Sequence, residues 1–274
     1  MKRKIIQWLS LIASNAYIPG FLRGNIYKGP LKQFCVPGLN CYSCPGALGS
    51  CPLGALQSVL GAIKYRFSYY VAGLLLLFGL LLGRFICGFL CPFGLVQELL
   101  HKAPLPKIKQ PWRRPRYIKY ALLLIFVIAM PLLAVNSLGM GDPAFCKFIC
   151  PAGTLGAGLP LIALNPPLRS ALGALFTWKL TLALFIVGGS LVVYRFFCRY
   201  LCPLGAIYGL FNRVSLYQLR CHKESCVKCG LCRSACRMGV DPAHESGSCE
   251  CIRCGDCVAA CPHKALSLGF RQPG

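Results

Sequence analysis

The sequence predicts a mainly α-helical membrane protein with four transmembrane helices in two duplicated hairpins, followed by a small C-terminal α+β domain. Of its 274 residues, 56% are apolar and only 14% are charged, which is more apolar than most soluble folds. Four stretches approach the roughly 20 apolar residues that cross a bilayer core. The twenty cysteines recur in short, repeated spacings. We expect a membrane domain over 1–212 and a C-terminal domain over 213–274.

The four predicted spans cover residues 5–22, 67–86, 117–135 and 176–196. The first is the weakest, because it contains Gln7, Ser10, Ser14 and Asn15, and its basic start also fits a signal peptide. A retained helix is favoured, since no clear small-residue cleavage site follows the apolar stretch.

The basic residues indicate the orientation of these spans. The 30 Lys and Arg residues outnumber the seven Asp and Glu, for a formal charge of +23. Of the basic residues, 22 fall in the segments that four spans would place on one side and eight on the other. The positive-inside rule therefore predicts a multi-pass protein of the cytoplasmic membrane with both termini in the cytoplasm. The charge then reflects topology, and nucleic acid is not an expected partner.

An internal repeat relates the two halves, over about 1–100 and 117–212. Residues 83–94 (GRFICGFLCPFG) resemble residues 194–205 (YRFFCRYLCPLG), each at the end of a predicted span. More loosely, 44–49 and 51–55 resemble 150–157. Each hairpin is therefore expected to present cysteines at both membrane faces.

The C-terminal cysteines follow two runs of the form C-x2-C-x2-C-x3-C. The pattern resembles bacterial dicluster ferredoxins, in which each run supplies three thiolates to one [4Fe-4S] cluster and its fourth cysteine to the other. Zinc knuckles, the alternative, give no reason for the fourth cysteine. Arg237 stands where that pattern has proline, and Cys221 and Cys249 are left over, although Cys249 could replace Cys251. The resemblance implies one cluster on Cys226, Cys229, Cys232 and Cys261, and a second on Cys251, Cys254, Cys257 and Cys236.

The membrane cysteines predict two further clusters. In each C-x3-C pair of the repeat, residues i and i+4 would share one helix face, and the following Pro92 or Pro203 ends or kinks the helix. An outer group draws on six cysteines, of which those in repeated segments are preferred and Cys35 and Cys41 are alternates. The predicted inner ligands are Cys87, Cys91, Cys198 and Cys202, and the predicted outer ligands are Cys44, Cys51, Cys146 and Cys150.

Other uses of the membrane cysteines remain open. Small apolar cysteines can simply pack between helices, soft thiolates also suit Cu(I), and the outer cysteines would form disulfides in an oxidising compartment. Three C-x3-C-P copies at the ends of duplicated hairpins favour the cluster interpretation.

The whole pattern resembles the NapH-type and NosR-type membrane iron-sulfur proteins. The features that carry the resemblance are the basic start, the loop Leu39-Asn40-Cys41-Tyr42-Ser43-Cys44-Pro45, the Cys-x3-Cys-Pro hairpins and the cysteine-rich tail. It implies transmembrane electron transfer, either as a conduit or as a quinol dehydrogenase subunit that feeds a respiratory reductase. A related branch reduces copper during oxidase assembly. The resemblance implies other redox proteins as partners, such as an outer-face reductase, with quinone as a further candidate. The basic excess on the predicted cytoplasmic face would in addition suit an acidic redox partner.

Several cofactors are not expected. No C-x-x-C-H motif for haem, no G-x-G-x-x-G for a nicotinamide, no flavin motif and no P-loop is present. The four histidines lie outside the predicted spans, which leaves no ligands for a haem in the bilayer. The spans also contain no acidic residue, so ion pumping is disfavoured.

A quinol site is harder to locate. Glu98, His101 and Asp142 lie near the cysteine pairs and could accept protons, but Glu98 and His101 read more simply as a solvated interfacial rim and Asp142 as a turn residue. Segments 46–62 and 153–164 are candidate re-entrant loops, which would shorten the electron's path. The protein is an enzyme only if it oxidises quinol itself.

Overall fold

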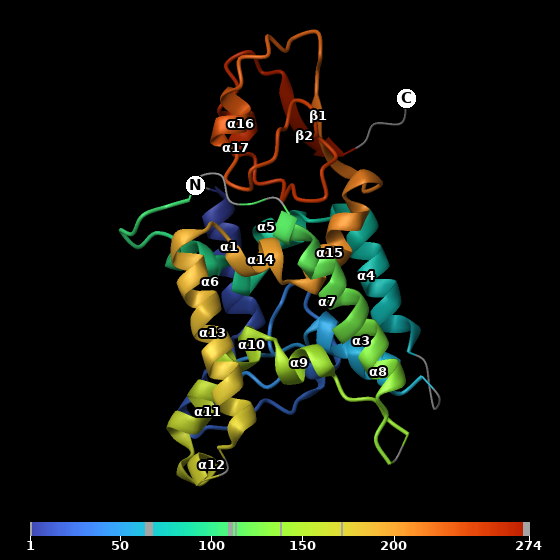
Figure 1. Cartoon of the computed structure of the whole chain (residues 1–274), viewed down its shortest axis with the longest axis vertical. Helices are drawn as coiled ribbons and strands as arrows, with labels where there is room; N and C mark the ends of the chain where they lie inside the picture. The colour runs from blue at the N-terminus through green and yellow to red at the C-terminus, as the bar shows by residue number, and fades with distance from the viewer. Residues whose placement is uncertain are drawn as a thin grey trace.

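Helices form the body of the molecule, and a small cysteine-rich unit covers one end of it (Figure 1). The computed structural model describes residues 2–63, 68–108, 112, 114–137, 139–170 and 172–270. The start of the chain lies at the same end as the C-terminal unit, because Arg3 Nη1 is 3.9 Å from Asp256 Oδ1. The two described ends of the chain therefore share one side of the body.

The first half contains seven helical segments up to residue 100. These are α1 (Lys2–Ser14), α2 (Ile18–Arg23), the short 3-10 helix η1 (Pro30–Gln33), α3 (Pro52–Gly61), α4 (Tyr69–Leu82), α5 (Phe85–Phe89) and α6 (Pro92–Leu100).

The second half begins with a helix that runs without a break through η2 (Arg114–Tyr117), α7 (Ile118–Leu122), η3 (Leu123–Ala129) and α8 (Met130–Leu133). Next come α9 (Ala144–Phe148), α10 (Pro151–Gly153), η4 (Thr154–Gly158), α11 (Leu159–Leu164) and α12 (Pro166–Ser170). The half ends with α13 (Ala174–Val192), α14 (Phe196–Tyr200), α15 (Pro203–Leu210) and η5 (Phe211–Arg213).

The C-terminal unit is built on one antiparallel strand pair. Strand β1 (Tyr217–Cys221) pairs with β2 (Leu266–Phe270), with Tyr217 opposite Phe270 and Cys221 opposite Leu266. Between the strands lie two short helices, α16 (Leu231–Ala235) and α17 (Asp256–Ala259), which pack against each other. This region therefore combines helices and strands, as predicted.

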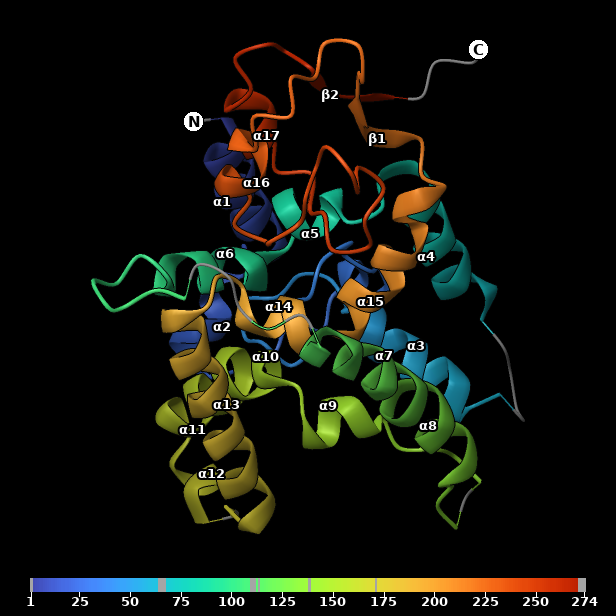
Figure 2. The same cartoon turned by 45° about the horizontal axis from the view of Figure 1, so that its top comes forward.

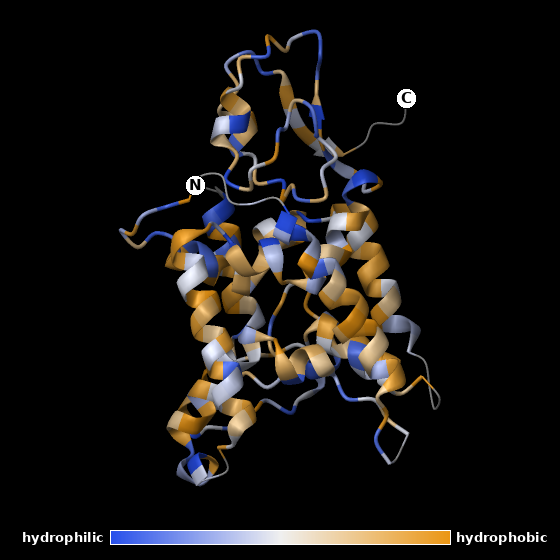
Figure 3. Cartoon of the chain, in the orientation of Figure 1, coloured by the Kyte–Doolittle hydropathy of each residue, from blue (hydrophilic) through white to orange (hydrophobic). Residues whose placement is uncertain are grey.

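Among the described residues, two helices are long and apolar enough to cross a membrane. They are the continuous helix Arg114–Leu133 and α13, and only 17% of the most apolar window of each is buried inside the molecule. The ribbons of both helices are coloured mainly as hydrophobic (Figure 3), as in helices that face lipid. They correspond to the third and fourth predicted spans, and four spans are not established.

The first predicted span, 5–22, is wrong as a single helix. α1 ends at Ser14, and α2 starts at Ile18. The Asn15 side chain bonds back to Leu11 O at 3.1 Å, which offers the chain a local alternative to helix. α1 also turns a polar residue inward: Gln7, which is 1% exposed, donates to Gly88 O at 2.9 Å.

The second predicted span, 67–86, is also shorter than expected, and its first residue lies outside the described part of the chain. α4 has 14 residues, about 21 Å of helix. It ends at Gly83, whose φ of +50° suits glycine. Arg84 N then donates to Asn212 Oδ1 at 2.9 Å, which turns the chain into α5.

Four of the Cys-Pro pairs start a helix instead of ending one. Cys51, Cys91, Cys150 and Cys202 cap α3, α6, α10 and α15, with extended backbone at the cysteine and proline at the first helical position. Proline disfavours helical backbone in the residue before it and suits the first turn of a helix. The expectation that each C-x3-C pair shares one helix face is therefore wrong.

Candidate metal centre

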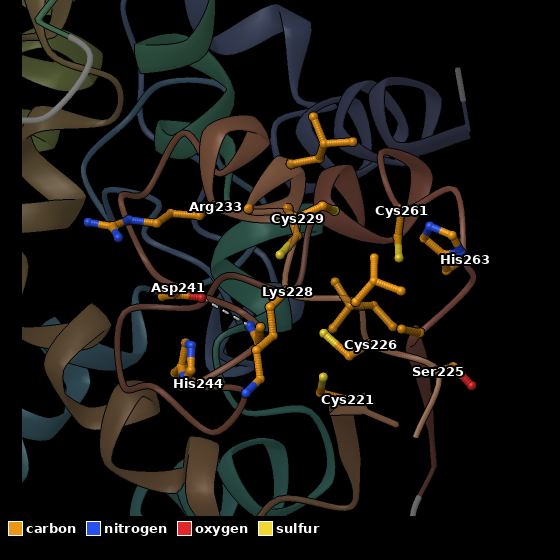
Figure 4. Close-up of a pocket in the computed structure, with 17 residues that line it drawn as sticks. Cys221, Ser225, Cys226, Lys228, Cys229, Arg233, Asp241, His244, Cys261 and His263 are labelled. Carbon is orange, nitrogen blue, oxygen red and sulfur yellow. Dashed lines mark hydrogen bonds between the residues drawn. The ribbon is translucent and has the colours of Figure 1, made fainter. Parts of the chain in front are cut away.

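The first cavity of the C-terminal unit collects four cysteines of the predicted set. It has a volume of about 200 Å³, and Cys226, Cys229, Cys232 and Cys261 line it. Figure 4 shows the sulfurs of Cys226, Cys229 and Cys261 directed toward this space from separate segments. Cys221 also lines it, so this left-over cysteine lies beside the predicted site.

A second, narrower cavity of about 20 Å³ collects the other four. Cys236, Cys251, Cys254 and Cys257 line it, together with apolar residues such as Ile252 and Leu268. Each run therefore places three cysteines on one cavity and its fourth on the other, as the dicluster resemblance implies. The turn after Cys236 forms without proline, since Val240 N lies 3.4 Å from Cys236 Sγ as a donor.

Within the described ranges, no three or more His, Cys, Asp or Glu side chains are close enough to share a single metal ion. A [4Fe-4S] cluster holds its four cysteine sulfurs farther apart than one ion does, because each sulfur binds a different iron. The cysteines of one site can therefore line a shared cavity without direct contact between their sulfurs.

The predicted inner cysteines lie in or at the start of α5, α6, α14 and α15, and α5, α6 and α14 lie at the end of the body next to the C-terminal unit (Figure 1). Figure 2 also shows α5 beside that unit. We call Cys87, Cys91, Cys198 and Cys202 the near group, because it is nearer the C-terminal unit. All four are buried. Burial, with the neighbouring Cys198 and Cys87, raises the pKa of the Cys91 thiol to about 12. Burial and the other three thiols raise the pKa of Cys202 in the same way.

Two buried arginines cross between the halves of the repeat at the near group. Arg84 Nη2 donates to Cys198 O at 3.0 Å, and Arg195 Nη1 donates to Cys87 O. Each arginine stands three residues before the first cysteine of its own half and is 0% exposed. Each half therefore holds the cysteine loop of the other.

A carboxylate balances each arginine. Arg84 Nη1 is 2.9 Å from Glu250 Oε2, and Arg195 Nη2 is 2.6 Å from Glu98 Oε1. Burial would raise the pKa of Glu98, but Arg195 and the neighbouring Lys4 and Arg3 hold it well below its usual range. Glu98, at 4% exposure, is thus part of an ion-pair network, and its expected place in a solvated rim is wrong.

Three of the predicted outer cysteines lie together with Cys41, which was an alternate ligand. Burial and then Cys150 raise the pKa of the Cys41 thiol to about 11, and burial, with Cys41 among the neighbours, raises that of Cys51 to about 11. Burial and then Cys150, Cys51 and Cys41 raise the pKa of Cys146. We call Cys41, Cys51, Cys146 and Cys150 the far group.

Cys44 was preferred from the repeat but has another neighbour. Its sulfur lies 3.8 Å from Asn15 Oδ1, and its thiol is also one of the neighbours that raise the pKa of Cys41. Cys35 pairs through its backbone with Ser50 in an isolated bridge. All twenty cysteines are free thiols, so none of the outer cysteines is in a disulfide.

Backbone contacts join neighbouring cysteine sites. A Cβ added to Gly88, next to Cys87, would lie 2.4 Å from Ile252 O, next to Cys251. The near group therefore touches the second cavity of the C-terminal unit.

The loop 34–51 joins the near group to the far group. The Leu39 backbone N–H lies beside the Cys91 thiol and lowers its pKa, and the next N–H along the chain, that of Asn40, does the same for Cys51. A Cβ added to Gly38 would lie 2.7 Å from Cys91 Cα. On the other side, the buried Tyr208 hydroxyl donates to Pro37 O at 3.0 Å. One loop thus contacts both groups.

The buried charges fit an anionic cofactor. The described residues with a 0% exposed cationic side chain include Arg84, Lys119, Arg195 and Arg199, and Glu250 and Glu98 are their buried counter-ions. Arg199 donates to Arg237 O at 2.7 Å, while its Nε and Nη1 have no partner. Unpartnered buried charge costs several kcal/mol, and a cluster with four thiolates carries about two negative charges.

The other proton-accepting candidates do not converge on the cysteines. Asp142 is exposed and bonds Lys147 at 2.5 Å, as expected for a surface turn. His101 stacks edge-on against Tyr194, with 5.5 Å between ring centroids, and its Nδ1 is buried without a partner. Neither has a contact with a near-group or far-group sulfur.

The sequence analysis gave Arg84 and Arg195 no role at the site, and it treated Cys41 only as an alternate outer ligand. The equal spacing of the two arginines before Cys87 and Cys198 was visible in the repeat and was the available signal. No comparable signal distinguished Cys41 from Cys44, because only the path of the loop 34–51 decides which of them faces Cys150.

Comparison with known families identifies iron-sulfur modules. A family model described as a 4Fe-4S binding domain matches residues 67–115, 121–161 and 175–220. A second model of the same description matches residues 250–267. The matches include the end of the first half of the repeat, most of its second half and the second C-terminal cysteine run.

Three relatives illustrate the likeness. An uncharacterised protein of Methanocaldococcus jannaschii is 29% identical over 200 residues, 70% of this chain and 74% of its own length. The methylamine utilization ferredoxin-type protein MauN of Paracoccus denitrificans is 30% identical over 219 residues, 76% of this chain and 69% of its own. The regulatory protein NosR of Stutzerimonas stutzeri is 29% identical over 180 residues, 61% of this chain but 22% of its own. No solved structure matches the chain.

Proposed function

The chain belongs to the NapH- and NosR-type family of 4Fe-4S ferredoxin-like electron-transfer proteins, and on that premise we propose that it carries electrons across a membrane through four [4Fe-4S] clusters. Two clusters would lie in the C-terminal unit, one at the near group and one at the far group. When bound, such clusters supply one-electron carriers. The protein's own part is to hold the four cysteine sites in sequence and shield them from water.

This proposal rests on the way in which the four cysteine sites follow one another through the molecule. Cys236 and Cys261 each line the cavity of the other cysteine run. Gly88, next to the near group, touches Ile252 of the second cavity. The loop 34–51 contacts both the near group and the far group. Each site therefore adjoins the next along the molecule, and electron transfer between carriers weakens steeply with separation.

We further propose that the body spans the cytoplasmic membrane more than twice, with both ends of the chain on the cytoplasmic side. In support, Arg114–Leu133 and α13 have the length of spans, and α4 adds a shorter apolar helix. Arg3 and Asp256 lie on the same side of the body. The apolar segments Pro52–Gly61 and Pro151–Leu164 are helical and would enter the bilayer from the opposite side.

Electron passage through vesicles tests the proposal. The full chain is purified anaerobically, analysed for iron and sulfide, and inserted into vesicles that hold ferricyanide, with a membrane-impermeant reductant outside. We expect about sixteen irons per chain and reduction of the trapped ferricyanide. Cys198→Ser is expected to abolish the passage, and Cys44→Ser to retain it. About eight irons, or copper in place of iron, would refute the four-cluster protein.

Quinol oxidation is a second candidate, favoured by an apolar cavity beside the far group. The cavity has a volume of about 470 Å³ and lies between α1, α6 and η4. Its lining includes Leu11, Phe93 and Leu155, with Cys41 at one side. A largely apolar space with a few polar groups at a redox centre suits a quinol ring.

Cluster reduction by quinol tests this second candidate. A short-chain quinol is added to oxidised protein in detergent, and bleaching of the cluster absorbance is followed. We expect reduction by wild-type protein and a loss of at least tenfold in its rate in Leu155→Trp, which fills the cavity, while dithionite reduces both equally. Equal rates with quinol would exclude this cavity as the quinol site.

A further inference from the structure

Two buried glutamines occupy matching places at the near and far groups. Gln57 lies on α3, six residues after Cys51, and Gln97 lies on α6, six residues after Cys91. Their exposed fractions are 0% and 1%. A buried amide needs partners for its donors and its acceptor, and both side chains find them on the opposite half of the repeat.

The partners of the two glutamines are the same in kind. Gln57 Nε2 donates to Cys146 Sγ at 3.2 Å, and its Oε1 accepts from Phe145 N at 2.9 Å. Gln97 Nε2 donates to Cys198 Sγ at 3.0 Å, and its Oε1 accepts from Phe197 N at 2.9 Å. In both cases the bonded cysteine is the first of its pair, and the bonded N–H precedes it in the chain.

The backbone fixes which end of each amide faces the sulfur. A backbone N–H can only donate, so it must meet the amide oxygen. The NH2 group is then directed at the cysteine. It also donates to the carbonyl four residues earlier in its own helix, Leu53 O at 3.2 Å or Phe93 O at 3.4 Å. The amide is therefore held as a donor to sulfur and cannot turn over without losing three bonds.

A hydrogen bond to a ligand sulfur acts on the electron equilibrium of a cluster. The reduced cluster carries one more negative charge, so a donor to its sulfur stabilises that form more and raises its reduction potential. We propose that Gln57 and Gln97 are positioning residues that hold the Cys146 and Cys198 sulfurs and raise the reduction potentials of the far and near clusters. This inference rests on the proposed function, because it needs a cluster at each group.

Redox titration of single variants tests the pair. Methionine has a similar length and no N–H, so Gln57→Met and Gln97→Met remove the donor with little change in volume. The midpoint potentials are measured by EPR on the anaerobically purified full chain. The near and far signals are identified as those missing from Cys198→Ser and Cys146→Ser. Gln33→Met, at an exposed glutamine of η1, is the matched control.

We expect each variant to change one cluster only. At the wild-type midpoint, the reduced-to-oxidised ratio of the near cluster falls about tenfold in Gln97→Met, and that of the far cluster in Gln57→Met. This is the size of effect expected for one hydrogen bond to a charged acceptor. Gln33→Met changes neither, and all three variants keep the wild-type iron content.

Two results would overturn the inference. Unchanged potentials at full iron content in both variants would show that the donors do not act on the clusters. Loss of iron from either variant, with no shift of the midpoint potential in the other, would show that the glutamines have a structural role only. A wild-type protein with about eight irons would instead refute the proposed function, so the two failures are distinguishable.

Discussion

The near and far groups share one local design in two electrostatic settings. Each is built from Cys-Pro helix starts of both halves, and each has a glutamine bonded to a cysteine sulfur. Two fully buried arginines bond to the near group's backbone, and both are paired with carboxylates. The far group has Lys179, which is half-buried and donates to Cys146 O at 3.1 Å.

The two groups thus share the arrangement of their cysteine ligands and differ in the charged side chains around them. The Cys-Pro starts and glutamines were duplicated with the chain, whereas the buried cations differ between the groups. The buried Lys32 beside Cys41 donates to Ala47 O at 2.7 Å, whereas both arginines donate directly to carbonyls of near-group cysteines. The near cluster is therefore stabilised more in its reduced form. We therefore expect the near cluster to have the higher potential.

The largest expected effect concerns the identity of the far group's fourth cysteine. Cys41→Ser is expected to lower the iron content from about sixteen to about twelve per chain, as Cys198→Ser does at the near group. Cys44→Ser keeps about sixteen, because its sulfur contacts Asn15 instead. Iron and sulfide analysis of the anaerobically purified proteins measures this, and the reverse result at Cys41 and Cys44 would restore the ligand set predicted from the repeat.

A smaller effect concerns the carboxylate that supports the near group. Glu98→Gln leaves Arg195, Arg3 and Lys4 without their counter-ion and is expected to destabilise the protein by about 3–5 kcal/mol. Asp142→Asn, at the exposed pair beside the far group, should cost about 0–1 kcal/mol. Thermal unfolding in detergent measures both, and equal shifts would contradict the difference in burial.

The same carboxylate has a defined pH dependence. The pKa of Glu98 is lowered in the folded protein, so its stabilisation is complete above about pH 4.3, the value for an unfolded glutamate. It is lost as the pH falls below that value toward the folded pKa. The stability difference between wild type and Glu98→Gln should therefore be constant at neutral pH and shrink in acid.

The smallest effect compares the cations directly. Arg195→Met is expected to lower the near cluster's potential by on the order of 1–2 kcal/mol per electron, where 1.4 kcal/mol is about 59 mV. Lys179→Met should lower the far cluster's potential by less than half of this. EPR titration measures both, and an equal or larger shift in Lys179→Met would remove the proposed electrostatic distinction.

Much of the site was predictable from local patterns. The C-x2-C-x2-C-x3-C runs encode short turns and helices, so their cysteines reach the two cavities with the predicted three-plus-one sharing. The quartet of the near group was predictable as well, because the repeat brings two equal segments together. The helix-face argument for that quartet failed, since Pro92 and Pro203 set extended backbone at Cys91 and Cys202.

The remaining errors come from contacts between distant segments. Apolar content suggested a span over 5–22, but Gln7 is satisfied by Gly88 O, far away in the chain, and Asn15 divides the helix. The span over 67–86 is cut at Gly83 by a contact with Asn212. The composition of a segment gives no information on such contacts with residues that are distant in the sequence.

By itself, the sequence determined the two long apolar helices and the paired cysteine runs of the tail, because these depend on neighbours within a few residues. Only the tertiary structure decided that Cys41 joins Cys150, that Arg84 and Arg195 exchange partners between the halves, and that Gln57 and Gln97 face sulfurs. Those contacts join residues that are far apart in the chain, and their formation depends on how the two halves pack.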